Sequence, residues 1–253
     1  MECRLQAESA RWTGRLKAVL QTTTAPQFLL VAFGLCAILA RSQPMTRAKF
    51  DKAAGEAIGA TVREIEAKTN AEIVVAVRGR SGTYRQADYL FGAVVTFVGL
   101  MFVLFSPFEF HTYWIPLDVV LLFLAGTFIS SRSDSVRRLL TTAAFRAKAA
   151  RSGAAAMFYE AGIANTSAEN GLLIYLSLLE KRMEVIADRG VLKAIPPLKW
   201  NHSVFELKRV GDDADPDKLI AAMRELGALL AEHMPATGEN PNELADGPSI
   251  QLK

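Results

Sequence analysis

The pattern of apolar and polar positions divides the chain into amphipathic, strand-like and long apolar segments. Between 45 and 68, apolar side chains recur at helical spacing with Lys, Arg and Glu between them, which predicts an amphipathic helix. The run EIVVAVR at 72–78 follows Asn70 and is short and rich in valine, which is typical of a buried strand. From 89 to 130, by contrast, the chain is almost free of charge.

Two apolar runs in that region predict a membrane hairpin. The first, YLFGAVVTFVGLMFVLF at 89–105, carries no charge and has about the length that a helix needs to cross the hydrocarbon core of a bilayer. The second, WIPLDVVLLFLAGTFIS at 114–130, follows a short aromatic stretch in which Pro107 acts as a breaker. We therefore expect a two-helix transmembrane hairpin over 88–131, with a pair of buried core helices as the alternative.

Within the hairpin, two kinds of residue are candidates for a role. Gly92, Thr96 and Gly99 share one face of the first helix, where small side chains allow close packing within the hairpin or between copies in a homo-oligomer. Asp118 is an ionisable residue inside an apolar run, which makes it a candidate intramembrane functional group. Its place one turn into the second helix also suits a carboxylate that faces the interface and the positive end of the helix dipole.

The distribution of positive charge predicts the orientation of the hairpin. The net charge of +3 is small, but arginine and lysine gather on both flanks of the hairpin and are missing from its loop. The flanking residues are Arg78, Arg80, Arg85, Arg132, Arg137, Arg138, Arg146, Lys148 and Arg151. The positive-inside rule then predicts a multi-pass membrane protein with both flanks, and the soluble domain continuous with them, in the cytoplasm. Contact with the lipid bilayer explains these residues without a nucleic-acid partner.

The status of the leader, residues 1–44, stays open between two interpretations. The apolar run QFLLVAFGLCAILA at 27–40 is short for a membrane span. It is either a third membrane segment, or part of a disordered leader or of a stretch upstream of a natural start at Met45. The two cysteines, Cys3 and Cys36, both lie in this leader, so a disulfide framework and a cysteine-based zinc site are excluded.

The chain after the hairpin predicts the rest of a soluble domain. The expected elements are an alanine-rich helix at 136–163 with Gly153 as a candidate break, strands at 172–179 and 182–188 joined by a turn at Glu180-Lys181, a capped helix from Asp215 to His233, and a disordered tail at 234–253. Because two crossings return the chain to the side it left, the strand at 72–78 can join the strands at 172–188 in one sheet. Residues 45–87 and 132–233 are therefore expected to form one discontinuous α/β domain.

These soluble segments resemble the TPM domain family. The likeness rests on TNAEIVVAVR at 69–78 and on AMFYEAGIANTSAENGLLIYLSLLEKRMEVIADRG at 156–190. The second segment fits the family's habit of a glycine-started strand, a charged turn and a strand that ends in a glycine-containing loop. It resembles especially the bacterial members with an internal membrane hairpin, although many relatives have a glycine-tyrosine-glycine type ending where this chain has Asp188-Arg189-Gly190.

The resemblance implies a small three-layer α/β/α domain and, for some relatives, divalent-metal binding or a weak acid phosphatase activity. Asp188 is the matched acidic residue for a metal, with a surface pair to Arg189 as the alternative. Independently, GDDADPD at 211–217 brings Asp212, Asp213 and Asp215 together in sequence, either as calcium ligands or as an acidic helix cap.

The sequence contains no nucleophile elbow, phosphate-binding glycine loop or paired-histidine metal spacing. We therefore predict no catalytic residue and no cofactor apart from the open question of Ca²⁺ or Mg²⁺. We expect a membrane-anchored cytoplasmic TPM-like domain that acts as a binding or assembly module for another membrane or cytoplasmic protein. The alternative is a divalent-metal-dependent, acid-phosphatase-like hydrolase in which Asp188 and the acidic loop hold the ion.

Overall fold

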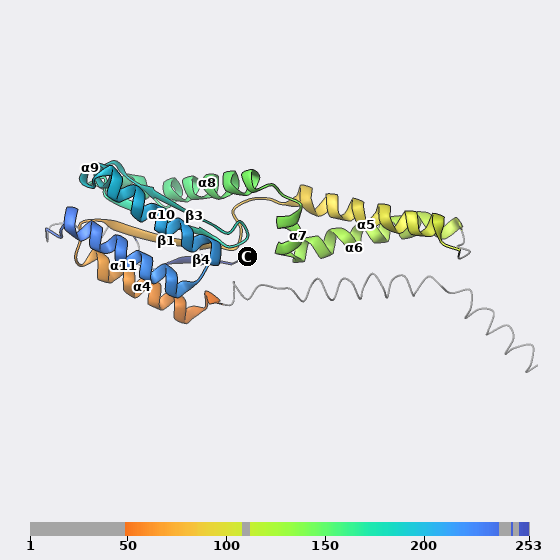
Figure 1. Ribbon diagram of the computed structural model, residues 1–253, viewed down its shortest axis with the longest axis horizontal. Helices are drawn as coiled ribbons and strands as arrows, with labels where there is room; N and C mark the ends of the chain where they lie inside the picture. Colours follow the sequence, from red (N-terminus) through yellow and green to blue (C-terminus); the bar gives the residue numbers. More distant parts are fainter. Residues whose placement is uncertain (1–48, 108–111, 238–243, 245–247, 253) are drawn as a thin grey trace, which may run out of the picture. The chain divides into compact units, whose positions relative to one another are not determined.

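The chain divides into two compact units, each of which is described by itself (Figure 1). In the computed structural model, the described residues are 49–107, 112–237, 244 and 248–252. Among the described residues, the first unit comprises Arg85–Leu140, which is here named the hairpin unit, and the second, the sheet unit, lies within Pro44–Tyr84 and Thr141–Lys253. The interpretations of the leader, 1–44, lie outside the described residues.

The sheet unit has a mixed α/β fold, as predicted. Its elements in chain order are α4 (Lys52–Glu66), β1 (Glu72–Arg78), α8 (Ala143–Glu160), η2 (Ile163–Asn165), β2 (Gly171–Ser177), β3 (Arg182–Ala187), α9 (Arg189–Ala194), α10 (Pro197–Asp213), α11 (Pro216–His233) and β4 (Ser249–Gln251). Asp51, Thr142 and Asp215 each accept a hydrogen bond from a backbone N–H in the first turn of α4, α8 and α11. Local sequence therefore decides where these three helices begin.

The four strands form one mixed sheet in the order β3-β2-β1-β4. β1 and β2 pair in parallel from Glu72↔Gly171 to Arg78↔Ser177, while β4 is parallel to β1 and β3 is antiparallel to β2. The prediction that the strand at 72–78 shares a sheet with the strands at 172–188 is confirmed. Because β1 precedes the hairpin unit and β2 follows it, main-chain hydrogen bonds join the chain on both sides of this insertion.

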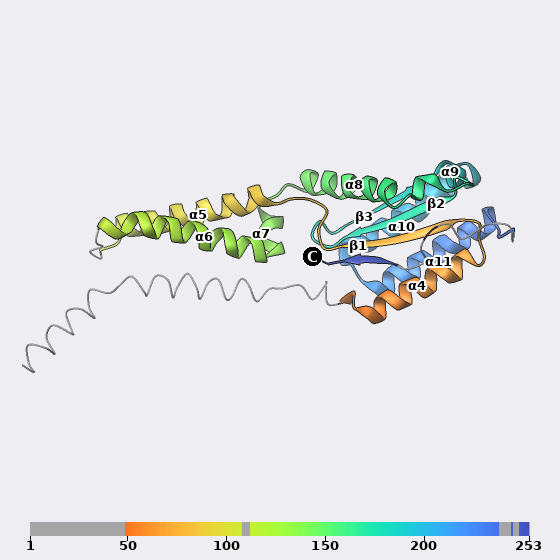
Figure 2. The ribbon, with the colours of Figure 1, turned by 180° about the vertical axis from the view of Figure 1, so that it is seen from behind.

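Apolar side chains are buried on both faces of the sheet. Ile73, Val75 and Val77 belong to a core cluster with α4, α10 and α11, whereas Val74 and Ala76 belong to a second cluster with α8. Neighbouring residues point to opposite faces of a strand, so helices contact each face of β1. Figures 1 and 2 show α4, α10 and α11 together, with α8 apart from them in the same unit.

The hairpin unit is helical. It consists of α5 (Arg85–Phe105), η1 (Thr112–Trp114), α6 (Ile115–Arg132) and α7 (Asp134–Leu139). α5 and α6 pack against each other, and both are long and apolar enough to cross a membrane. The helices predicted at 89–105 and 114–130 are therefore confirmed as helices. Among the described residues, Arg85–Leu140 of this unit extends beyond both ends of the predicted range 88–131.

The segment predicted as helical at 136–163 is helical over most of its length, but it is divided at another place than the predicted one. The chain forms two helices, α7 and α8, and Thr142 caps the second one by accepting a hydrogen bond from Phe145 N–H. Gly153, predicted as a break, lies inside α8, where a Cβ would be 2.7 Å from the Tyr175 hydroxyl oxygen. Glycine at this position permits the close approach of α8 to the sheet and does not end the helix.

Four elements of the sheet unit, η2, α9, α10 and β4, are missing from the sequence prediction. Pro196-Pro197 predicts an interruption, yet Pro197 is the first residue of α10, where its lack of an N–H costs no hydrogen bond. The disordered tail predicted at 234–253 needs correction at Ser249–Gln251, because these residues pair with Ala76–Arg78 as β4. Pairing with β1 provides hydrogen bonds for the backbone of these residues, and it orders a segment whose polar sequence does not by itself predict a strand.

The contact between α10 and β3 yields a prediction. A Cβ on Gly211 would lie 2.7 Å from the Met183 backbone nitrogen. The backbone of a paired strand cannot move aside to relieve this clash as a flexible side chain could. We expect Gly211→Ala to lower the free energy of unfolding by about 1–3 kcal/mol, although alanine favours a helix. Chemical denaturation of the full chain in detergent, followed by circular dichroism, measures the change.

Asp212→Ala is the control for that variant. Asp212 is the next residue on α10 and is exposed, so its substitution should change the stability by less than about 0.5 kcal/mol. Unchanged or increased stability in Gly211→Ala would contradict the close contact between α10 and β3.

Candidate functional site

A buried carboxylate lies at the carboxyl ends of the parallel strands β1 and β2. Glu180, in the turn after β2, is 3% exposed. Its Oε1 accepts hydrogen bonds from Ser81 N–H (2.9 Å) and the Tyr84 hydroxyl (2.6 Å), and its Oε2 accepts one from the Ser177 hydroxyl. Ligands of open α/β sheets gather at this edge, so these residues form a candidate site. With Tyr175, they are here named the Glu180 cluster.

The hydroxyl groups of the Glu180 cluster form an ordered chain of donors. Ser81 Oγ donates to Ser177 Oγ at 2.6 Å, so the Tyr175 hydroxyl, 2.8 Å from Ser81 Oγ, is the donor in that pair. Each hydroxyl proton therefore points along the chain toward the Glu180 carboxylate. Burial raises the pKa of Tyr175 above its ordinary value, the hydrogen bond with Ser81 lowers this pKa, and the negative charge of Glu180 raises it.

Local backbone geometry brings the cluster together. The turn after β2 places Lys181 in the left-handed region, with a φ of 49°. In the same turn, the N–H groups of Leu178 and Leu179 donate to the carbonyl oxygens of Arg78 and Gly79 at 3.0 and 3.1 Å. These bonds tie the turn to the segment that follows β1, which carries the other donors to Glu180.

Tyr84 links the two places where the chain leaves and rejoins the sheet unit. It is the last residue before the hairpin unit, and Phe145 lies in the first turn of α8, just after that unit. The two rings meet edge to face with their centroids 5.8 Å apart. The Glu180 cluster therefore holds the two ends of the insertion next to each other within the sheet unit.

Sequence reasoning predicted Glu180 only as a turn residue. One signal for its burial is present, since Tyr175 and Ser177 are two residues apart on β2 and so place polar groups on one face of an apolar strand. The partners Ser81 and Tyr84 lie almost 100 residues away in sequence and give no comparable signal.

Asp188, the predicted metal ligand, lies at the opposite edge of the sheet. It follows β3, which runs antiparallel, and its N–H donates to the carbonyl oxygen of Gly171, the first residue of β2. Its Oδ1 accepts a hydrogen bond from the backbone N–H of Arg189 and caps α9, while its Oδ2 is buried without a hydrogen-bond partner among the described residues. Asp188 therefore does not lie at the edge where the carboxyl ends of the parallel strands β1 and β2 meet.

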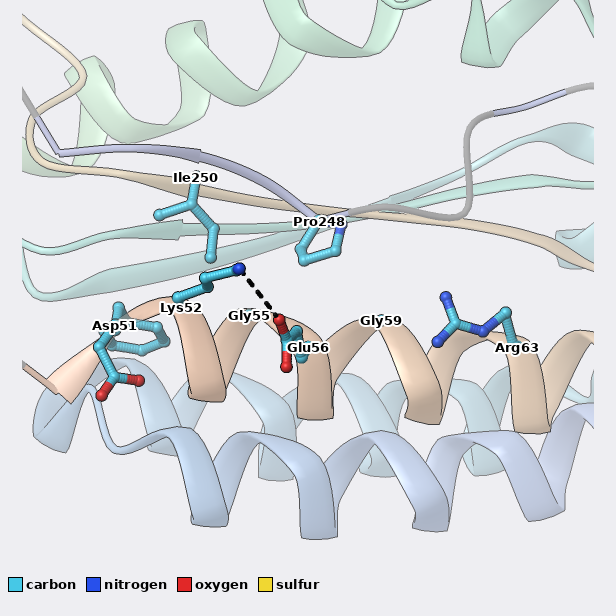
Figure 3. Close-up of a pocket in the computed structure, with 9 residues that line it drawn as sticks. Asp51, Lys52, Gly55, Glu56, Gly59, Arg63, Pro248 and Ile250 are labelled. Atoms are coloured by element: carbon cyan, nitrogen blue, oxygen red, sulfur yellow. Dashed lines mark ion pairs between the residues drawn. The ribbon is translucent and has the colours of Figure 1, made fainter.

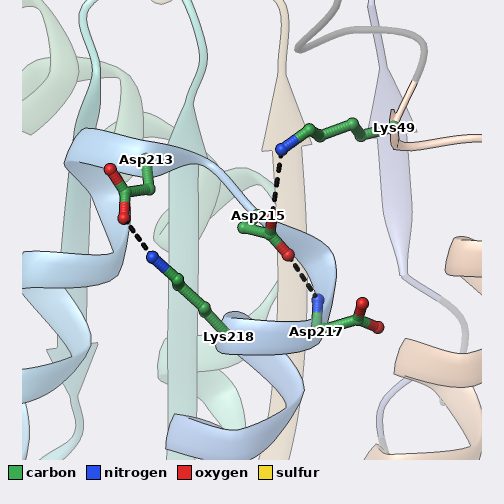
Figure 4. A network of polar contacts seen from close by, with 5 residues as sticks. All are labelled: Lys49, Asp213, Asp215, Asp217 and Lys218. Carbon is green, nitrogen blue, oxygen red and sulfur yellow. Dashed lines mark hydrogen bonds and ion pairs between the residues drawn. The ribbon is translucent and has the colours of Figure 1, made fainter.

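In the acidic loop between α10 and α11, the carboxylates pair with lysines or cap a helix (Figure 4). Asp213 pairs with Lys218, and Asp215 pairs with Lys49 at 2.9 Å while it caps α11 by accepting from Asp217 N–H at 3.1 Å. The hydrogen bonds from these lysines lower the pKa of both Asp213 and Asp215 below their ordinary values. Of the alternatives for this loop, the acidic helix cap fits Asp215 directly.

The structure does not bring Asp188 and the acidic loop together. Gly211 at the end of α10 contacts Arg182 and Met183 at the start of β3, whereas Asp188 follows the end of β3. Six strand residues separate these points, which corresponds to about 20 Å. Asp212 is exposed next to Asp213. Within the described part of the chain, no group of three His, Cys, Asp or Glu residues could hold a metal ion.

The hairpin unit contains a buried ion pair that the sequence analysis did not identify. Arg137 of α7 donates to Asp88 of α5 through both Nε and Nη2, at 3.0 and 2.8 Å, and Ser130 Oγ of α6 donates to Asp88 Oδ1 at 2.8 Å. The side chains of the pair are 7% and 8% exposed. One carboxylate thus joins α5, α6 and α7, and the two-pronged geometry strengthens the pairing.

The predicted hairpin residues occupy different places in the unit. Gly92 and Gly99 are buried where α5 meets α6. Gly126 on α6 approaches Gly92 so closely that a Cβ added to Gly126 would lie 2.9 Å from the Cα of Gly92. Thr96 is partly buried and its hydroxyl donates to the Gly92 carbonyl at 2.8 Å. Asp118 is partly buried in the first turn of α6 and has no hydrogen bond or ion pair to another described residue.

No family model and no curated protein matches the sequence. The chain is similar to the NMR structure of the BA42 protein from the psychrophilic bacterium Bizionia argentinensis, with a TM-score of 0.48 and 15% sequence identity. That similarity covers 79% of this chain and 94% of the other. A likeness of this size supports no conclusion about the function of the chain.

The Glu180 cluster predicts a change in the titration of Tyr175. Glu180→Gln removes the negative charge that raises the pKa of Tyr175, so this pKa should fall but stay above its ordinary value, because burial is the larger cause. The same variant should lose about 1–3 kcal/mol of stability, since a carboxylate oxygen that accepts hydrogen bonds becomes an amide donor. Ultraviolet titration of tyrosinate and chemical denaturation measure the two effects.

The exposed Glu160 on α8 supplies the control for this variant. Glu160→Gln should leave both the tyrosine titration and the stability as in the parent chain. A Tyr175 pKa that rises in Glu180→Gln, or that does not move, would contradict the arrangement of the cluster.

The Asp88–Arg137 pair predicts strong destabilisation when one partner is removed. Arg137→Met leaves a buried carboxylate unpaired, which should cost the hairpin unit about 3–5 kcal/mol. Asp88→Leu combined with Arg137→Met should recover most of the loss, because both charges are then absent. Unfolding of the full chain by sodium dodecyl sulfate, followed by circular dichroism, compares the variants with Arg85→Met, an exposed control. Equal losses in Arg137→Met and Arg85→Met would refute the pairing.

Proposed function

We propose that the chain is a membrane-anchored binding or assembly module. In this proposal, the hairpin unit crosses the bacterial inner membrane twice, and the sheet unit acts in the cytoplasm on another membrane or cytoplasmic protein.

The outer surface of α5 and α6 carries the proposal. Only 17% of the apolar stretch of each helix is buried within the structure, whereas a pair of core helices would be covered. The exposed large apolar side chains are Tyr89, Leu90, Val94, Phe97, Val98, Phe102, Leu104, Phe105, Leu117, Val120, Leu121, Leu124 and Phe128. An apolar surface of this extent is costly in water and suits a hydrocarbon environment.

The sheet unit supports a double crossing. A hairpin that crosses a bilayer twice leaves and rejoins the soluble domain on the same side, so the two chain ends must lie close together. The contact between Tyr84 and Phe145 provides this closeness within the sheet unit. The basic flanks of the hairpin then favour the cytoplasmic side for both ends.

We interpret the sheet unit as a three-layer α/β/α domain of the TPM type. The sequence resemblance supports this interpretation, as do the apolar clusters on the two faces of the sheet. Calcium and magnesium have no place in the proposal, because Asp188 caps α9 while Asp213 and Asp215 pair with lysines. The glycine face of α5 already packs on α6, so a homo-oligomer formed through the hairpin would have to use the outer apolar surface.

Arginine substitutions on the outer surface test the anchor. Phe97 and Leu124 are 61% and 57% exposed near the middle of α5 and α6. The double variant Phe97→Arg/Leu124→Arg places two charges in the hydrocarbon core, at a cost of about 2.5–3.5 kcal/mol each on insertion scales. We expect most of the chain to lose its resistance to extraction from membranes by alkaline carbonate.

The matched control places arginine at exposed apolar positions of the sheet unit. Leu198 and Phe205 on α10 are 86% and 60% exposed, and Leu198→Arg/Phe205→Arg should leave membrane retention unchanged. Equal retention of both double variants would overturn the anchor. A reporter fused after Lys253 that is active only outside the cytoplasm would overturn the orientation.

The binding role is separated from hydrolysis by an activity assay. Purified full chain is incubated with a generic phosphomonoester and Mg²⁺ or Ca²⁺, alongside Asp188→Asn. Hydrolysis that disappears in Asp188→Asn would contradict a binding or assembly role and favour the hydrolase.

A further inference from the structure

The helix α8 has one face on the sheet and one face open to solvent. Its sheet-facing side carries the buried residues Ala150, Ala154 and Phe158, four residues apart. The opposite side, here named the outer face of α8, consists of Phe145, Lys148, Ser152, Ala156 and Tyr159, all exposed. Their spacing of three or four residues places them in one stripe along the helix.

The outer face combines aromatic rings with positive charge. Phe145 and Tyr159, near its two ends, are 43% and 71% exposed. Lys148 lies between them and Arg151 flanks the stripe, and neither has an ion pair with another described residue. Glu160, at the C-terminal end, is the acidic residue of α8. Aromatic rings favour the interface of a bilayer, and cations are attracted to anionic headgroups.

The chain connects this face closely to the hairpin unit. Ser133–Thr142 is all that separates α6 from α8 in sequence, and part of it is folded as α7. A hairpin in the membrane would therefore keep α8 at a high local concentration near the bilayer surface, where weak attractions suffice for contact.

We infer that the outer face of α8 rests on the anionic headgroups of the membrane that the hairpin spans. This inference rests on the proposed function and adds the surface and the lipid chemistry. In this arrangement the sheet unit contacts the bilayer along α8. The helices α4, α10 and α11 lie on the other face of the sheet and stay accessible to a protein partner.

Lipid fits this face better than a protein partner does. Protein interfaces depend on a few anchors seated in well-packed pockets, and the outer face has only Lys148, Ser152 and Ala156 between its two rings. A pocket of about 480 Å³ lies elsewhere in the sheet unit, between α4 and β4. Its lining includes Gly55, Arg63 and Ile250 (Figure 3).

The test measures how near α8 comes to lipid headgroups. The full chain, with Cys3→Ser and Cys36→Ser, is labelled with a fluorophore at Ser152→Cys on α8 or at Ala228→Cys, an exposed position on α11. Each is reconstituted in vesicles of phosphatidylcholine, alone or with about one third phosphatidylglycerol, that contain a headgroup-nitroxide lipid as quencher. We expect strong quenching at 152 in the anionic vesicles and little at 228.

Charge removal then tests the attraction. Each cation near an anionic surface contributes about a fivefold preference, so Lys148→Gln/Arg151→Gln should lower the ratio of docked to free α8 about 25-fold. Lys52→Gln/Arg63→Gln, which removes a lysine and an arginine from the exposed side of α4, should leave the quenching at 152 unchanged.

The outcomes separate this inference from the anchor on which it rests. A chain that fails to float with the vesicles refutes the anchor. A chain that floats but shows equal quenching at 152 and 228 refutes only the docking of α8. If quenching at 152 is the same with and without anionic lipid, and is unchanged in Lys148→Gln/Arg151→Gln, recognition of anionic lipid is refuted.

Discussion

The parallel pairing of β1 with β2 is the constraint on which the rest of the sheet unit depends. The register from Glu72↔Gly171 to Arg78↔Ser177 joins two segments that are separated in sequence by the whole hairpin unit. It fixes which residues of β1 face α8 and which face α4, α10 and α11. It also aligns the carboxyl ends of the two strands, where the insertion begins and where the turn with Glu180 lies. A parallel pair needs a long crossover, and here that crossover contains a complete helical unit as well as α8.

Each unit places a buried carboxylate where chain segments meet. Glu180 accepts hydrogen bonds from Ser81, Tyr84 and Ser177, and Asp88 accepts from Arg137 and Ser130. A buried charge is tolerated only when donors surround it, so each carboxylate makes one arrangement of its neighbours strongly preferred. The acidic residues of the loop before α11, by contrast, pair with lysines near the surface and contribute mainly a helix cap.

The direction of one strand explains why the predicted metal residues do not converge. A strand ending in an acidic residue indicates a ligand site only when it runs parallel to its neighbours, because only then do the carboxyl ends share an edge. β3 returns from the tight turn after β2 and is antiparallel, so Asp188 arrives beside Gly171. The sequence predicts the turn at Glu180-Lys181. A tight turn between paired strands makes the second strand antiparallel, so the position of Asp188 follows from hairpin geometry.

The sequence by itself determined the local elements: the apolar helices α5 and α6, the buried runs of β1 and β2, and the capped starts of helices such as α11. These depend on periodicity, charge and capping within a few residues, which the order of amino acids carries directly. Tertiary structure decided the pairing of β4 with β1, the continuation of α8 through Gly153, and the burial of Glu180 and Asp88. Each of these depends on partners far away in the chain, and a glycine or a carboxylate has the same local pattern whether or not such a partner is present.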